Sequence, residues 1–274
     1  MSKGHIFLAQ NGNVDYVRQA CALALSIKKF NTINETCIVT NDVIPKEYEH
    51  AFDYVVNIPW TDSAKDSSWK IENRWKIIHA SPFKENLVYD TDMLLLNSND
   101  HWWHSFKGKS LSFTTNVVDY NGKIITDDYY RKVFTGNNLP NIYTGCFYFK
   151  KDAVAYEFFK WLEVIVKNWT EIYKKHLDVS PQKFLSIDVS AALAYIYMDN
   201  TADISINHCV PTFTHMKPAI QGWKNIPSLW SSTIYSSFNN ECQLKVGGMM
   251  QQGLFHYVED EFLQEHMLKK LMRK

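Results

Sequence analysis

The chain has 274 residues, of which 46% are hydrophobic and 15% aromatic, so it is long enough for one large α/β domain with a sizeable core. Lysine plus arginine and aspartate plus glutamate number 29 each, and this balance excludes a global electrostatic field that would attract nucleic acid or an anionic membrane. The five scattered cysteines contain no C-x-x-C pair and indicate reduced thiols. With no signal-like or membrane-length apolar run, we expect a cytoplasmic protein without membrane contact.

The first hundred residues alternate between strand-like and helix-like segments. Short apolar runs predict strands at 5–9, 36–40, 54–56 and 86–89. Helices are expected over 13–29, with Asn13 as the cap, and over 71–79. This order is typical of a parallel α/β sheet, whose ligands bind beyond the carboxyl ends of the strands.

The remainder of the chain carries less regular signals. A polar stretch over 119–141 predicts a loop or lid, and 201–240 is irregular with many Pro, Trp and Ser residues. Strands are predicted at 111–114, 142–150 and 253–257. Helices are predicted from Asp152 to about Lys175, over 188–197 and over 259–273. We expect residues 1–274 to form a single domain.

Two carboxylates, Asp90 and Asp92, follow the apolar run 86–89 and precede a second apolar run, 93–96. Alternate residues of an extended segment face the same way, so the pair can hold one hard cation against phosphate oxygens. Such a cation stabilises the charge that develops when a sugar–diphosphate bond breaks. The alternative is that the two residues cap a turn or pair with lysines.

The segment Leu-Val-Tyr-Asp-Thr-Asp-Met-Leu-Leu-Leu, residues 87–96, resembles the D-x-D segment of GT-A glycosyltransferases, especially the family 8 and glycogenin-like enzymes. The stretch 141–147 resembles their N-x-G strand, and Asp188 is similar to the acidic residue of their D-Q helix, although valine follows it here. The resemblance implies a GT-A fold, with a Rossmann-like, mostly parallel central sheet flanked by helices and a smaller acceptor-binding part. Residues 1–100 would form the nucleotide-sugar half, 101–258 the acceptor half with its loops, and 259–274 a C-terminal helix.

The same resemblance implies a cofactor, Mn²⁺ or Mg²⁺, and a nucleotide-sugar donor, a UDP-sugar. Asp90, Asp92 and a histidine would hold the metal. Family 8 enzymes end with a histidine followed by glycine and K-P-W, and this chain divides those features between His215-Met-Lys-Pro and Gly-Leu-Phe-His256-Tyr. We prefer His256 as the third ligand because it lies in an apolar strand before the terminal helix, with His215 as the alternative.

Several further residues are expected at the donor. The resemblance places Gln10, Asn11, Tyr16 and Thr91 near the nucleotide. Arg74 and Lys76 precede the D-x-D strand, where a cation offsets phosphate charge. Lys217 is another candidate for contact with the diphosphate.

The reaction implied by the resemblance is sugar transfer to a hydroxyl with retention of anomeric configuration. Asp188 is the candidate for contact with sugar or acceptor, and joins Asp90 and Asp92 as a predicted catalytic residue. An inverting enzyme needs a carboxylate base on the acceptor hydroxyl, and Asp188 or Asp119 could serve.

The acceptor is predicted to be a glycan. The composition is also similar to that of viral (phage) transferases that modify hydroxymethylated DNA bases, which would place the protein in the host cytoplasm and make a modified DNA base the acceptor. Four aromatic residues of the irregular region could stack on a sugar or a base, although core packing is the commoner role: Trp223, Trp230, Tyr235 and Phe238.

Two other functions are compatible with the Asp pair. Haloacid-dehalogenase-like phosphatases also carry D-x-D after an apolar strand, but normally at the first strand of the chain rather than near residue 90. A GT-A scaffold could also bind a nucleotide sugar without catalysis. The sequence leaves the oligomeric state open.

Overall fold

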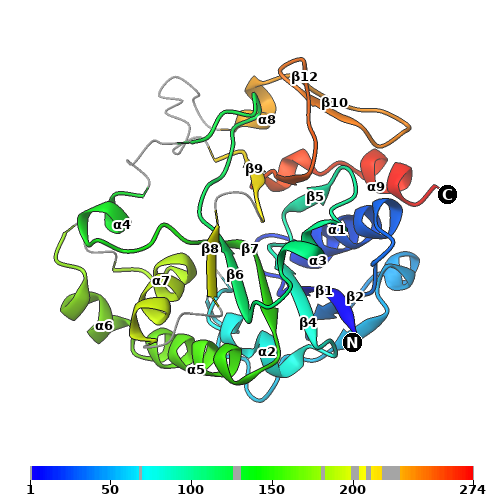
Figure 1. The fold of residues 1–274 in the computed structure, drawn as a ribbon. Helices are drawn as coiled ribbons and strands as arrows, with labels where there is room; N and C mark the ends of the chain where they lie inside the picture. The colour runs from blue at the N-terminus through cyan, green and yellow to red at the C-terminus, as the bar shows by residue number, and fades with distance from the viewer. Residues whose placement is uncertain are drawn as a thin grey trace.

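The computed structural model describes residues 2–67, 70–125, 131–179, 183–198, 204–207, 211–217 and 229–273. Its centre is a seven-stranded sheet in the order β3-β2-β1-β4-β7-β6-β8 (Figure 1). The strands of this sheet are β1 (Lys3–Leu8), β2 (Thr36–Val39), β3 (Tyr54–Val56), β4 (Glu85–Tyr89), β6 (Leu111–Thr114), β7 (Tyr143–Lys150) and β8 (Ile204–Asn207). All neighbours pair in parallel except β7, which is antiparallel to both β4 and β6.

The reversed direction of β7 determines which residues meet at the sheet edge. Tyr89, the last residue of β4, pairs with Cys146 near the start of β7. The first residues of β7 therefore lie beside the carboxyl ends of the parallel strands, where the ligands of an α/β sheet bind.

The sheet separates two apolar cores, because successive strand residues face opposite sides. Phe7 and Leu87 belong to one core, whereas Ile6 and Val88 belong to the other. Helix α1 (Tyr16–Phe30) packs in the first core, and α5 (Ala153–Lys167) and α7 (Ile187–Tyr197) pack in the second (Figure 1). The sheet is thus covered on both faces, as the sequence predicts for a parallel α/β arrangement.

Two three-stranded sheets extend the first core. In one, β13 (Leu254–His256) lies between β5 (Met93–Leu95) and β9 (Phe213–His215). The other comprises β10 (Ser236–Phe238), β11 (Leu244–Val246) and β12 (Met249–Met250). The shorter helices are α2 (Ile77–Ala80), α3 (Trp102–Ser105), α4 (Lys132–Gly136), α6 (Trp169–His176), α8 (Trp230–Thr233) and α9 (Glu265–Leu271), with 3-10 turns at Lys46–Ala51, Arg74–Lys76 and Asp260–Phe262.

Four predictions of local structure need correction. Asp15 rather than Asn13 caps α1, and its side chain accepts from the N–H of Arg18. The helix predicted over 71–79 is a 3-10 turn followed by the short α2. The helix predicted from Asp152 ends at Lys167, because the side chain of Asn168 donates to the carbonyl of Val164 and closes that helix before α6 begins.

The C-terminal segment is also divided, since the backbone is extended between the 3-10 turn and α9. The polar stretch 119–141 contains α4 within its described part, and the described parts of 201–240 contain β8, β9, α8 and β10. The pattern of apolar residues along the sequence did not predict these short elements. They are too short to show a clear period, and contacts with distant parts of the chain stabilise them.

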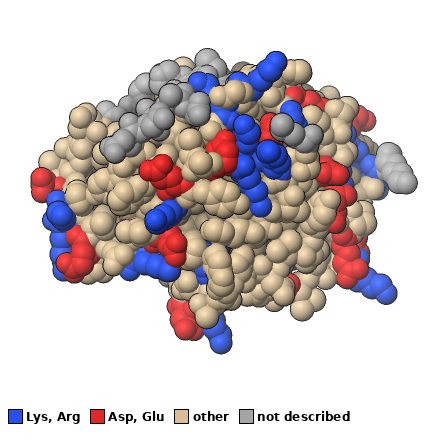
Figure 2. Space-filling model, turned by 60° about the horizontal axis from the view of Figure 1, so that its bottom comes forward, with Lys and Arg blue, Asp and Glu red and all other residues tan. Residues whose placement is uncertain are grey.

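None of the helices in the described ranges is both long and apolar enough to cross a membrane. Figure 2 shows basic and acidic side chains interspersed on one face of the molecule, in keeping with the balanced charge of the sequence.

Candidate functional site

A cavity of about 680 Å³ opens where β1, β4 and the start of β7 meet. One wall comes from the first hundred residues and includes Gln10, Tyr16 and Arg74. Other lining residues come from α4, the start of β7 and the start of α7. The pocket therefore joins the two regions that the sequence assigns to donor and acceptor.

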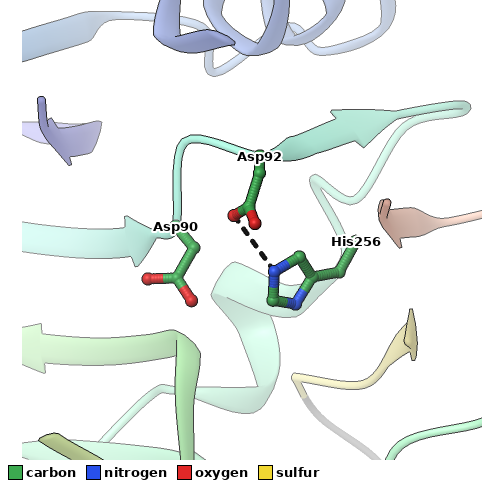
Figure 3. A group of neighbouring side chains, drawn as sticks. All are labelled: Asp90, Asp92 and His256. Carbon is green, nitrogen blue, oxygen red and sulfur yellow. Dashed lines mark ion pairs between the residues drawn. The ribbon is translucent and has the colours of Figure 1, made fainter. Parts of the chain in front are cut away.

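Three potential metal ligands converge in this pocket (Figure 3). Asp90 directly follows β4, Asp92 precedes β5, and His256 ends β13. One ligand atom from each lies within 4.8 Å of the others, and His256 Nε2 is 3.0 Å from Asp92 Oδ1. The strands explain this convergence, because His256 pairs with Met93, the residue after Asp92.

The environment keeps Asp92 ionised. Burial acts to raise the pKa of Asp92, but the adjacent His256 outweighs it and the net pKa lies below the usual value. The backbone also fixes this turn, since the N–H of Tyr257 donates to the carbonyl of Asp92 at 3.0 Å.

Asp90 is positioned by β7. Its N–H donates to the carbonyl of Gly145 at 2.8 Å. A Cβ on residue 145 would lie 3.0 Å from Asp90 Oδ2 and 3.0 Å from the terminal carbon of Met93. The absence of a side chain at Gly145 therefore leaves room for the Asp90 carboxylate.

The buried guanidinium of Arg74 forms an ion pair with Asp90. Burial lowers the pKa of Arg74 to about 10, and the group remains a cation at neutral pH. Arg74 thus places a fixed positive charge beside the carboxylate pair, inside the pocket. A cation in this position can stabilise a phosphate oxygen.

His215, the alternative third ligand, lies directly beside His256. The two residues are paired across β9 and β13, and their ring centroids are 4.6 Å apart. Burial and the neighbouring His256 hold the pKa of His215 well below its ordinary value. Of the two rings, that of His256 groups with both carboxylates, which makes it the better placed ligand.

A strained turn follows His256. Val258 has φ of 66°, and the N–H of Glu259 donates to the carbonyl of Tyr257 at 2.7 Å, which closes a γ-turn. Val258 lines the pocket. A β-branched residue with positive φ is costly, and such strain gathers at functional sites.

Asp188, at the start of α7, lines the same pocket and is held from two sides. Its Oδ1 accepts from the N–H of Thr144 at 2.8 Å and from the Thr144 hydroxyl at 2.5 Å. Its Oδ2 accepts from Arg131 Nη1 at 2.6 Å. Burial alone would raise the pKa of Asp188, but Arg131 and Thr144 lower it.

Arg131 itself is missing from the sequence-based site residues, because it lies in the polar stretch predicted to be a loop. Its side chain is 4% exposed, and its charge near the apolar pair Val133-Phe134 was the available signal. The structure places it among the residues that line the pocket, as it does Arg74.

The residues predicted for the nucleotide divide into two groups. Gln10, Tyr16 and Thr91 line the pocket. The Gln10 amide is fixed by Asp62, which accepts from it, and by Asn73, which donates to it, each at 2.8 Å. Asn11 is not among the lining residues, and its side chain accepts from the N–H of Val17 at the start of α1.

The predicted cations also differ in position. Lys217 lines the pocket. Lys76 is 2% exposed and is not among the lining residues. Its ammonium donates to the carbonyl of Thr61 and to the hydroxyl of Ser63, so it stabilises the preceding loop instead.

The remaining predicted side chains lie elsewhere. Asp119 is not among the pocket-lining residues and accepts from the N–H groups of Asn121 and Lys123. Trp230 and Phe238 are buried in the first core, whereas Tyr235 is 78% exposed. Trp223 lies outside the described residues.

The donor set suits a hard divalent cation. Two carboxylates and one imidazole are ligands that Mn²⁺ accepts, and three protein ligands leave positions open for phosphate oxygens. Within the described ranges His256 Nδ1 is buried without a hydrogen-bond partner, so the ring has a nitrogen that no described residue engages. The residues present fit the metal that the D-x-D resemblance implies.

No protein-family model matches the sequence, and no curated protein was found to match it. Solved structures do match. The galactosyltransferase LgtC, in complex with donor and acceptor sugar analogues, is 13% identical with a TM-score of 0.52, covering 98% of this chain and 94% of that chain. Mouse xyloside xylosyltransferase 1 is 8% identical with a TM-score of 0.52, covering 93% and 97% respectively. The glycosyltransferase GlyE from Streptococcus pneumoniae is 10% identical with a TM-score of 0.52, covering 99% and 60%.

These similarities, with the mostly parallel sheet flanked by helices, show that the chain has the GT-A glycosyltransferase fold. The fold expected from the D-x-D segment is therefore confirmed. Nothing in the comparisons favours the phosphatase alternative.

Proposed function

We propose that the protein is a metal-dependent glycosyltransferase that transfers a sugar from a nucleotide diphosphate sugar, a UDP-sugar, to a hydroxyl group of a glycan with retention of configuration. One observation carries the proposal: Asp90, Asp92 and His256 converge at the end of a buried strand, inside a pocket of about 680 Å³ in a GT-A fold. Two carboxylates and an imidazole nitrogen that approach one point in this way offer the ligand set of a divalent cation.

Asp90, Asp92 and His256 would hold Mn²⁺ or Mg²⁺. The bound cation supplies positive charge where the departing diphosphate becomes more negative. Arg74 adds a second, fixed positive charge beside Asp90. Because both charges are preorganised, little reorganisation is needed as the sugar–phosphate bond lengthens.

Different residues of the pocket would contact different parts of the substrate. Gln10 and Tyr16, at the end of β1 and the start of α1, would contact the nucleotide in the half formed by residues 1–100. Asp188, at the start of α7 in the same pocket, would contact the donor sugar. The exposed ring of Phe184, 66% accessible at the pocket rim, offers an apolar face to the acceptor.

The first experiment is donor hydrolysis and thermal stabilisation with a panel of nucleotides and UDP-sugars, each with Mn²⁺ and with EDTA. We expect one UDP-sugar to stabilise the fold only when Mn²⁺ is present, since ligand binding to the native state raises its apparent stability. Asp92→Asn should abolish the Mn²⁺-dependent shift and turnover, whereas Asp178→Asn, an exposed aspartate remote from the pocket lining, should behave as the wild type.

Full Mn²⁺-dependent turnover by Asp92→Asn protein would exclude the metal assignment. Binding of a UDP-sugar without hydrolysis or transfer to any glycan would favour a non-catalytic nucleotide-sugar-binding protein. Transfer to DNA containing hydroxymethylated bases, and not to glycans, would replace the proposed acceptor.

A further inference from the structure

We propose that Arg131 is a positioning residue for the donor sugar: together with Thr144 it orients Asp188 so that the carboxylate has one acceptor position left, for one sugar hydroxyl. The inference rests on the proposed function, because it assigns the contact that distinguishes a nucleotide sugar from the nucleotide alone.

The hydrogen bonds of Asp188 define the free position. A carboxylate has about four acceptor positions, two on each oxygen. Oδ1 already receives the N–H and the hydroxyl of Thr144, and Oδ2 receives Arg131 Nη1. With the donors of the described residues counted, one position on Oδ2 remains, and the side chain is 20% exposed in the pocket.

The same bonds limit the chemistry of Asp188. A carboxylate that accepts three hydrogen bonds and pairs with a guanidinium is stabilised as the anion. In keeping with this geometry, its pKa is lowered despite burial. Asp188 therefore accepts a hydrogen bond from the substrate and is poorly suited to act as the base of an inverting reaction, which must bind a proton during turnover.

Arg131 is held rigidly enough to fix this geometry. Its guanidinium carbon lies 3.7 Å from the ring centre of Phe134 and 3.9 Å from that of Tyr143. Its Nε donates to Asn141 Oδ1 at 2.7 Å, and Nη2 donates to the carbonyl of Ile142. All three guanidinium nitrogens of Arg131 are hydrogen-bonded, and two aromatic rings pack against its guanidinium carbon. These contacts fix the orientation in which the guanidinium binds Asp188.

The position of this unit suits a sugar rather than a phosphate. Thr144, which binds Asp188, is followed by Gly145, which makes room for the Asp90 carboxylate. The Asp188 carboxylate lines the same pocket as the metal ligands. A ligand extending from the metal toward α7 reaches Asp188 next, and a hydroxyl is the donor that its free position requires.

The test measures binding of UDP and of the UDP-sugar selected by the panel above, each with Mn²⁺, by isothermal titration calorimetry. Arg131→Lys retains the charge but loses the planar fork, and Thr144→Val removes one donor to Oδ1 while keeping its N–H. We expect both variants to weaken UDP-sugar binding with UDP binding unchanged, by up to roughly 10–100-fold, the value of a hydrogen bond to a charged group.

A double-mutant cycle separates positioning from general structure. In the Asp188→Asn background, Arg131→Lys should cause no further loss of UDP-sugar affinity, because the carboxylate that it orients is already gone. Arg18→Lys serves as the matched control, since Arg18 donates to the carbonyl of Leu263 and is not among the pocket-lining residues.

Wild-type UDP-sugar affinity in both variants would overturn the inference. Equal loss of UDP and UDP-sugar affinity would also overturn it, because that pattern marks a general disturbance of the pocket. If the wild-type protein binds UDP with Mn²⁺ but no UDP-sugar, the assignment of Arg131 fails while the nucleotide site stands. If it binds no nucleotide, the proposed function fails, and the inference fails with it.

Discussion

Gly145 and Asp90 are coupled twice across β4 and β7: the N–H of Asp90 donates to the carbonyl of Gly145, and the Asp90 carboxylate occupies the space that a side chain at 145 would need. The second contact is strict, since a Cβ there would meet Asp90 Oδ2 at 3.0 Å. Strand pairing and metal-ligand geometry thus depend on the same residue.

Gly145→Ala should therefore weaken Mn²⁺ binding by roughly tenfold or more, because the added methyl group displaces Asp90, and should cost about 1–3 kcal/mol of stability through overpacking. Mn²⁺ titration followed by electron paramagnetic resonance measures the first effect, and urea unfolding without metal measures the second. Unchanged Mn²⁺ affinity in the variant would show that the carboxylate tolerates the methyl group.

The two histidines should differ in their effect on metal binding. His256→Ala removes a ring nitrogen that lies with both carboxylates, and the loss of Mn²⁺ affinity should exceed the roughly 10–100-fold typical of an outer-sphere partner. His215→Ala, which removes only the neighbouring ring, should stay within that range. A larger loss in the His215→Ala protein would reverse the assignment of the third ligand.

Arg74 should affect metal and nucleotide in opposite directions. Arg74→Gln removes a cation that pairs with Asp90, so Mn²⁺ alone should bind roughly tenfold or more tightly, as expected from losing a nearby like charge. UDP should bind more weakly in the presence of saturating Mn²⁺, because the phosphates lose a cation. Calorimetric titrations of Mn²⁺ and then UDP test both signs, with Arg18→Gln as the control. Weaker Mn²⁺ binding in Arg74→Gln would contradict this account.

His5 should make folding stability dependent on pH. Its Nε2 is 2.8 Å from the carbonyl of Ile33, so it donates there, and Nδ1 accepts from the hydroxyl of Tyr89 at 3.0 Å. Burial lowers the pKa of His5 from 6.5 to about 4, so the unfolded chain binds the proton more readily. The stability is fully present above pH 6.5 and is lost as pH falls toward 4, by up to about 3 kcal/mol.

Urea unfolding between pH 4 and pH 7 tests this prediction. The difference in unfolding free energy between wild type and His5→Gln should narrow as pH falls, because only the wild type loses the contribution of a neutral buried ring. His50→Gln, at an exposed position in the 3-10 turn after β2, should run parallel to the wild type. Parallel curves for His5→Gln as well would show that His5 titrates normally in the folded protein.

The sequence predicted those parts of the site that follow directly from apolar runs. The apolar run 86–89 predicted a strand that leads into Asp90 and Asp92, and the structure has β4 there, with both carboxylates at the pocket. The run 93–96 was expected to continue that strand, but the chain bends at 91–92 and the run forms β5 in a separate sheet. The choice between His215 and His256 was harder, because both lie in short apolar strands and the structure pairs them side by side. Only the approach of His256 to Asp92 distinguishes them.

Other site features depend on contacts that no local pattern contains. Lys76 and Arg74 are two residues apart, yet a 3-10 turn directs one toward Thr61 and the other toward Asp90. Arg131 lacked any motif, and its role depends on Asp188, which is 57 residues away in the chain. Such pairings arise from tertiary packing, which overrides local propensity.

The antiparallel direction of β7 has a mechanical consequence. Thr144 holds Asp188 and the next residue, Gly145, adjoins Asp90, so a single strand at the centre of the sheet sets the spacing between the metal ligands and Asp188. This end of β7 is anchored on the β4 side by the pairing of Tyr89 with Cys146 and by the bond from the Asp90 N–H to the Gly145 carbonyl, whereas its pairing with β6 shifts register between Phe147 and Tyr143. A displacement of this end of β7 would therefore move the contacts of the Asp188 and Asp90 carboxylates together, because Thr144 holds one and Gly145 adjoins the other.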